Sequence, residues 1–290
     1  MKSKAFKRIT LSLLGAVLTG MLAGCGGLDV TSTLSPQMSG EVQGNRADLL
    51  KTVLDTETIV FAMEGQWAPW TYHDDDDKLV GYDKELGDAI AQKLGVKAEY
   101  VEGEWDTLFS GLDEGRYDAI INGITITPER MERYSFSTPY AYDYTALAVK
   151  SSNNTISDFE DLKGIRAAAS FGSVYSDIVA SYGAEIIYVD TIAESIKNVV
   201  LDKSDAVVNS LSSLNDYMMQ YPDTPIKVVA VTDEPTEIAI CLRKEAQSES
   251  LIEAINKAIS ELSEDGTLRG LSRKYFGTDH SLSRKMIQTD

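Results

Sequence analysis

The chain has 290 residues, a length typical of about two domains, and its 43% hydrophobic and 25% charged residues argue against a disordered or fibrous protein. Its 27 basic and 45 acidic residues give a formal net charge of −18, which argues against binding to a nucleic-acid backbone. Two cysteines and two histidines are too few for a disulfide framework or a His-rich metal site, so we expect no metal.

The N-terminal segment is typical of a secreted protein. Four basic residues within the first eight precede an apolar run at 9–22 that is short for a membrane span but suits a signal peptide. The run ends in Leu-Ala-Gly-Cys, which resembles the bacterial lipobox; the alternative is an ordinary secretory signal with a chance cysteine. We predict a signal peptide at 1–24, a lipid on Cys25, and a flexible tether at 25–54 that is rich in Gly, Ser, Thr and Gln.

From residue 58 onward, short apolar runs alternate with segments of helical period. We predict strands at 58–63, 96–101, 118–122 and 165–169, and helices at 82–94, at 105–112 and from a capping box at Ser250 and Glu253 to Gly266. This alternation predicts an α/β fold with a mainly parallel sheet that is covered on both faces.

One internal similarity predicts two related lobes. Residues 105–122 and 192–209 have the same length, and both end in Asp-Ala, two apolar residues and Asn. We expect Asn122 and Asn209 at the carboxyl ends of two buried strands, where open α/β sheets bind their ligands. The alternative is that Asp-Ala-Val-Val is merely a common start of a buried strand.

Aromatic residues follow the first predicted strand and open a later helix. Trp67 and Trp105 could clamp the body of a small molecule. The alternative is that both tryptophans pack in the core.

Arg130 is placed unusually. Thr127 and Pro128 are suited to the N-cap and the first position of a helix, which puts Arg130 in the first turn. A guanidinium is unfavourable there, so we expect it to meet an anion such as a carboxylate. The alternative is a surface salt bridge to Glu129 or Glu132.

A second anion-binding turn is predicted at residues 169–173. It follows a predicted strand, and Ser173 could cap a helix from Val174 whose free N–H groups would bind an anionic group. No G-x-S-x-G, H-E-x-x-H or Walker A motif is present. We therefore expect a protein without catalytic residues or a cofactor.

An ordered series of motifs resembles solute-binding protein family 3, the polar amino-acid receptors of bacterial ABC importers. It covers about residues 58–277 and includes Gly-Tyr-Asp at 81–83, Thr-Ile-Thr-Pro-Glu-Arg at 125–130, Phe-Ser-Thr-Pro-Tyr at 136–140 and Asp-Leu-Lys-Gly at 161–164. The resemblance implies a periplasmic-binding-protein type II fold, with two α/β lobes joined by a two-strand hinge. Lobe 1 would comprise 55–144 and 238–278, lobe 2 would comprise 145–237, and a tail would follow at 279–290.

The resemblance also implies a ligand site. Arg130 would bind the ligand's carboxylate with Thr125 as its hydroxyl partner, and the lobe 2 turn would use Gly172, Ser173 and the N–H of Val174. The remaining implied contacts are Glu64, Trp67, Trp105, Asn122 and the carbonyl of Gly123.

One residue departs from the family pattern. Many members carry an aspartate for the ligand's α-ammonium where this chain has Ser210, so Glu64 or Asn209 would have to substitute.

The implied function is a lipid-anchored, extracytoplasmic and monomeric receptor. It would close on a polar amino acid, with cystine or a related amino acid as the ligand, and dock on an ABC permease with its ATPase. Motifs at 72–74, 77–79, 94–97 and 105–106 resemble the cystine-binding branch. The alternatives are an enzyme on the same scaffold, similar to cyclohexadienyl dehydratase and using Glu64, or a ligand sensor.

Overall fold

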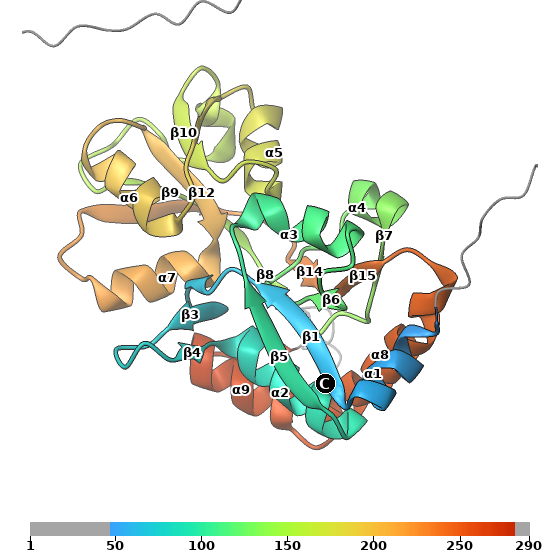
Figure 1. Ribbon diagram of the computed structural model, residues 1–290. Coiled ribbons are helices and arrows are strands. Elements are labelled where there is room, and N and C mark those ends of the chain that lie inside the picture. The colour runs from blue at the N-terminus through green and yellow to red at the C-terminus, as the bar shows by residue number, and fades with distance from the viewer. Residues whose placement is uncertain (1–46, 282–290) are drawn as a thin grey trace, which may run out of the picture. The chain divides into compact units, whose positions relative to one another are not determined.

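The computed structural model describes residues 47–281, which form two α/β lobes built on two five-stranded sheets (Figure 1). The first sheet has the order β5-β1-β6-β15-β7. Strands β5, β1 and β6 are parallel to one another. Strand β15 runs antiparallel to both of its neighbours, β6 and β7. The bounds are β1 Thr58–Met63, β5 Lys97–Glu102, β6 Ala119–Ile120, β7 Tyr134–Phe136 and β15 Cys241–Arg243.

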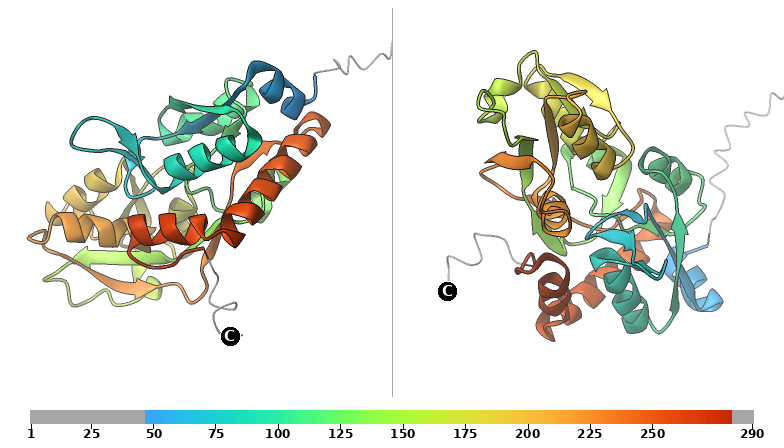
Figure 2. Two further views of the ribbon diagram at one scale, coloured as in Figure 1. Left: turned by 90° about the horizontal axis from the view of Figure 1, so that it is seen from below. Right: turned by 90° about the vertical axis from the view of Figure 1, so that its left-hand side faces the viewer.

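Helices cover both faces of the first sheet because side chains alternate along β1. Phe61 and Met63 pack in one core against α1 (Leu49–Thr56), α2 (Tyr82–Leu94), α8 (Glu249–Glu264) and α9 (Thr267–Phe276). Ala62 faces the opposite core, which holds α3 (Trp105–Asp113). Figure 2 shows α8 and α9 following one another along this lobe, beside α2.

The second sheet has the order β11-β10-β12-β9-β13 and repeats this design. Its first three strands are parallel, and β9 runs antiparallel to both of its neighbours. One face packs against α5 (Val174–Ser181) and the 3₁₀ helix η1 (Phe159–Leu162), and the other against α6 (Ile192–Val200) and α7 (Leu211–Gln220). The strand bounds are β9 Thr145–Lys150, β10 Arg166–Ala169, β11 Glu185–Tyr188, β12 Ala206–Ser210 and β13 Ile226–Val231.

Two paired strands connect the lobes. β8 (Ala141–Asp143) leads directly into β9, and β14 (Thr236–Ile238) leads from β13 back to β15. They pair antiparallel to each other, and Figure 1 shows them between the two sheets. The remaining elements are a hairpin layer of β2 (Gln66–Trp67), β3 (Thr71–His73) and β4 (Leu79–Val80), the short helix α4 (Pro128–Arg133) and the 3₁₀ helix η2 (Ala246–Ser248).

The structure confirms the type II two-lobed fold and corrects three details of the sequence prediction. The sheets are mixed rather than mainly parallel, because β7, β9, β13 and β15 run against their neighbours. Helix α8 begins at Glu249 with Ser248 at its N-cap, so Ser250 lies inside the first turn and forms no capping box; its hydroxyl donates to Asp48 Oδ2 at 2.7 Å. Residues 49–54 belong to helix α1 rather than to a tether, because Leu49 and Val53 are buried against the first lobe.

The predicted signal peptide and the lipidation site Cys25 lie outside the described residues. Within residues 47–281, none of the helices is both long and apolar enough to cross a membrane.

Candidate functional site

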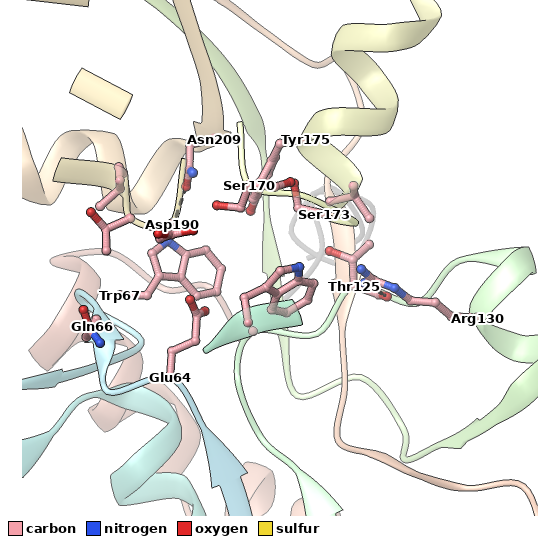
Figure 3. A pocket seen from close by; sticks show the side chains of 15 residues that line it. Glu64, Gln66, Trp67, Thr125, Arg130, Ser170, Ser173, Tyr175, Asp190 and Asn209 are labelled. Atoms are coloured by element: carbon pink, nitrogen blue, oxygen red, sulfur yellow. Dashed lines mark hydrogen bonds between the residues drawn. The ribbon is translucent and has the colours of Figure 1, made fainter. Parts of the chain in front are cut away.

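A pocket lies where the parallel strands of both sheets end. Fifteen residues line it (Figure 3). Those from the first lobe follow β1 and β6 or lie on α3 and α4. Those from the second lobe follow β10 and β11 or, in the case of Asn209, lie near the end of β12. This is the edge at which open α/β sheets bind ligands. Predicted site residues in the lining are Glu64, Trp67, Trp105, Gly123, Thr125, Arg130, Ser173, Val174 and Asn209.

Arg130 presents a positive charge to the pocket. Thr127 caps α4 by accepting the Arg130 backbone N–H at 3.1 Å, which fixes the start of the helix. The guanidinium donates to the Thr125 carbonyl oxygen at 3.0 Å and to the Gly172 carbonyl oxygen at 3.4 Å. Burial lowers the pKa of Arg130, and within residues 47–281 it forms no ion pair with a carboxylate. A half-buried guanidinium bonded only to neutral oxygens is suited to receive an anion.

Aromatic rings pack beside this charge. The Arg130 guanidinium carbon lies 5.4 Å from the centre of the Trp105 ring and 5.3 Å from that of Phe109. Cation–π contacts of this kind hold a guanidinium in place without neutralising it. Trp105 therefore both lines the pocket and orients the cation.

Glu64 is held by Asn122. The Asn122 side chain accepts the Glu64 backbone N–H at 2.8 Å and donates its Nδ2 to Glu64 Oε2 at 2.6 Å. Desolvation, together with the smaller effect of the nearby charge of Glu104, raises the pKa of Glu64 to about 7 against the opposing effect of the Asn122 hydrogen bond. Asn122 itself is buried behind the pocket and positions Glu64 rather than lining the cavity.

The turn after β6 fits closely around Trp67. Gly123 has a φ of +56°, and a Cβ built on it would lie 2.5 Å from the Trp67 ring. Its N–H donates to the buried Asp83 carboxylate at 2.5 Å, and desolvation raises the pKa of Asp83 to about 7. Only glycine fits this position without strain. Trp67 in turn donates its Nε1 to Asn209 Oδ1 in the second lobe at 3.3 Å.

The N-terminus of α5 faces the same pocket. The Ser173 hydroxyl accepts the Ser176 N–H at 3.1 Å and donates to the Ser170 carbonyl oxygen at 2.7 Å. Ser173 and Val174 line the cavity, and the N–H groups of a first helical turn have no partner within the helix. Together with Arg130, this end of the pocket suits a carboxylate.

Ser210 does not line the pocket. Its hydroxyl donates to Asp143 Oδ2 at 2.7 Å and accepts the Ser213 N–H at 3.1 Å. The Ser212 hydroxyl donates to the same Asp143 oxygen at 2.7 Å. Position 210 therefore serves the connection between the lobes, since Asp143 ends β8.

Two further predicted residues, Asn122 and Gly172, also lie behind the lining, in contact with Glu64 and Arg130 respectively. Ser170, which also lines the pocket, belongs to the turn predicted at 169–173. Five further lining residues were not predicted from the sequence: Gln66, Tyr175, Asp190, Thr191 and Ile192. Residues 190–192 directly follow β11, so the rule that ligands bind at the carboxyl ends of parallel strands could have found them.

A pocket between two α/β lobes, lined by an unneutralised guanidinium and indole rings, defines a two-lobed small-molecule receptor of the type II class. Residues 59–278 match the profile of the bacterial extracellular solute-binding proteins, family 3. The chain belongs to this family, which includes the substrate-binding proteins of amino-acid ABC transporters and whose members are extracytoplasmic.

Individual relatives agree with this assignment. The chain is 34% identical to a probable amino-acid ABC transporter-binding protein of Haemophilus influenzae, over 87% of this chain and 97% of the relative. It is 31% identical to the L-cystine-binding protein TcyA of Bacillus subtilis, over 95% and 99% of the two chains. Among solved structures, an ancestral arginine-binding protein bound to arginine matches with a TM-score of 0.71 and 33% identity, over 76% of this chain and 98% of that chain.

Proposed function

We propose that this chain is the substrate-binding component of an ABC importer and that it captures a polar amino acid in the pocket between its lobes. The observation that carries the proposal is the Arg130 guanidinium, which faces the pocket with no protein carboxylate paired to it within residues 47–281. A ligand carboxylate would pair with this guanidinium through charge-assisted hydrogen bonds, each contributing about 1.5–3 kcal/mol to binding.

The neighbouring groups suit the rest of an amino acid. The carboxylate would lie between Arg130, with Thr125 as its hydroxyl partner, and the first turn of α5. The Gly123 carbonyl and Glu64 or Asn209 would face the α-ammonium. Trp67 and Trp105 would cover the side chain from the first lobe, since indole rings supply apolar area at little entropic cost.

Cystine or a related amino acid is the ligand that we propose first. Two relatives at 31% and 33% identity are named as L-cystine-binding proteins. Two other similar proteins were solved with arginine bound, so the ligand panel in any test should include both cystine and arginine.

The same proposal covers the surroundings of the receptor. The lobes, the first comprising 49–144 plus 238–278 and the second 145–237, would close on the ligand about β8 and β14. The closed monomer would dock on a permease with its ATPase, held at the membrane by a lipid on Cys25 after removal of residues 1–24.

One observation supports an enzyme on the same scaffold as the second candidate. Glu64 is a pocket carboxyl with a pKa of about 7, as a general acid–base residue requires. Asn122 holds one of its oxygens, which suits a fixed binding group equally well. We therefore rank a dehydratase-like activity, and a pure ligand sensor, below the receptor.

Isothermal titration with Arg130→Ala tests the proposed function. We expect the variant to lose at least about 100-fold in affinity for every amino acid that the wild type binds, since about 3 kcal/mol of charge-assisted bonding disappears. Arg133→Ala is the matched control, because Arg133 lies on the same helix but is exposed and paired with Asp113 at 3.1 Å. Retained affinity in Arg130→Ala, or a wild type that binds no amino acid, would overturn the proposal.

A further inference from the structure

The pocket has an acid at the end opposite to Arg130. Its charged lining residues are Arg130 and Glu64 from the first lobe and Asp190 from the second. Figure 3 shows Arg130 at one end of the lining and Asp190 near the other. Arg130 and Asp190 thus come from different lobes and stand at separate places along the lining. With the α-carboxylate at Arg130, Asp190 is available to a different group of the ligand.

Asp190 is held by its backbone and leaves its carboxylate available. It lies between β11 and α6, directly before the N-cap Thr191. Its N–H donates to Glu194 Oε2 at 3.4 Å, which ties the main chain to the first turn of α6. In the part of the chain that the structure describes, its carboxylate accepts no hydrogen bond and forms no ion pair.

The other acids near the pocket are less suited to bind a cation there. Asp143, the acid next to position 210, is buried and accepts the hydroxyls of Ser210 and Ser212. Glu64 is bonded to Asn122, and its pKa of about 7 leaves it partly protonated at neutral pH. Asp190 is thus the acid that the second lobe contributes to the lining.

Further acidic residues lie beside Asp190. An adjoining cavity is lined by Asp190 together with Glu104, Asp106, Trp105 and Phe171, and no Lys or Arg belongs to its lining. The field of these carboxylates favours a positive group and disfavours a negative one. The two rings would cover the apolar stem that leads to such a group.

We propose that Asp190 binds a second cationic group of the ligand, so that the receptor selects amino acids with an ammonium or guanidinium beyond the side-chain stem. Arginine and ornithine meet this description with a cationic side chain, and cystine meets it with the ammonium of a zwitterionic second end, whereas glutamine, citrulline and glutamate have no such group. This inference rests on the proposed function, because it assumes that Arg130 holds the α-carboxylate at the other end.

Titration calorimetry on the chain without residues 1–24 tests the inference with arginine, ornithine, cystine, citrulline, glutamine and glutamate. Arginine and citrulline form a matched pair, since they share a shape and differ in charge. We expect at least one of the first three to bind at least tenfold more tightly than any of the last three. We also expect Asp190→Asn to remove this advantage and Asp190→Lys to abolish binding of the cationic ligand. The control is Asp223→Asn, an exposed acid of the second lobe outside this pocket, which should change nothing.

Each other result counts against the inference. A wild type that prefers citrulline, glutamine or glutamate, or an Asp190→Asn variant within twofold of wild type for its best ligand, would overturn it while leaving the proposed function intact. Loss of discrimination in Glu64→Gln but not in Asp190→Asn would move the cation site to Glu64 and overturn the assignment. If the wild type binds none of the six, the inference fails, and if it binds no other amino acid either, the proposed function fails with it. Unchanged melting temperatures of the ligand-free variants would show that any loss of affinity is not unfolding.

Discussion

At the scale of single residues, Glu64 makes the stability of the protein depend on pH. Desolvation raises its pKa to about 7, while an unfolded glutamate titrates near about 4.3. Between these values the folded state keeps a proton that the unfolded state has lost. The contribution of Glu64 to the free energy of unfolding therefore falls as pH rises through this window, by up to about 3 kcal/mol.

Glu64→Gln should remove this dependence, because the amide cannot ionise but keeps an acceptor for Asn122. We expect the variant to gain stability relative to wild type as the pH is raised from 4.5 to 8, and to show no such gain at pH 4. Urea unfolding at a series of pH values measures the difference. Glu99→Gln, at an exposed position of β5, should give a difference that does not vary with pH. If the stability difference between Glu64→Gln and wild type is also the same at every pH, the pKa of Glu64 is not raised in the folded protein.

At the scale of elements, the turn after β6 supports the Trp67 wall of the pocket. Gly123→Ala would force a side chain into the left-handed region at φ +56° and within 2.5 Å of the Trp67 ring. We expect a loss of about 1–3 kcal/mol in stability and a shifted indole, with weaker ligand binding. Urea unfolding and tryptophan fluorescence report these two effects. Gly270→Ala in α9 is the control, since its Cβ meets nothing within 4 Å and should stabilise the helix slightly. If Gly123→Ala and Gly270→Ala have the same stability and the same tryptophan fluorescence, position 123 does not require glycine.

Elements with strong local signals were predictable from the sequence. The strand Thr58–Met63 and the helix Tyr82–Leu94 have the predicted bounds, because an apolar run defines the first and a helical period ending at Gly95 defines the second. The antiparallel partners of β6 and β12 were not predicted. Their pairing joins residues that lie far apart in the sequence, such as Cys241 and Ile120. A pattern within a short stretch of sequence cannot predict such a pairing.

The candidate site shows the same division. Arg130 and Thr127 could be recognised from a helix start, and the structure places Arg130 in the pocket. The role of Ser210 could not be foreseen, because its partner Asp143 lies 67 residues away in the sequence. Asp190 precedes an ordinary N-cap and carries no motif, so it could have been found only by predicting the strand β11 and applying the rule that ligands bind where parallel strands end.

At the scale of the whole molecule, Asp143 links the connecting strands to the second lobe. It ends β8, and its Oδ2 accepts the hydroxyls of Ser210, at the end of β12, and Ser212, in α7, each at 2.7 Å. The Ser212 hydroxyl also accepts Trp70 Nε1 from the first lobe at 3.2 Å. These groups are buried, so each depends on the others for its hydrogen bonds.

Asp143→Ala should therefore disturb both lobes at once. It leaves two buried hydroxyls without their acceptor, at a cost of about 1–3 kcal/mol each, so we expect a loss of about 2–4 kcal/mol in the free energy of unfolding. Asp143→Asn keeps an acceptor oxygen and should lose less. Urea unfolding followed by both circular dichroism and tryptophan fluorescence measures the loss. Because the tryptophans are at 67, 70 and 105, fluorescence reports the first lobe, and a single shifted midpoint by both probes would show that the lobes unfold together. A wild-type midpoint in Asp143→Ala would show that the hydroxyls find other partners and that Asp143 does not couple the lobes.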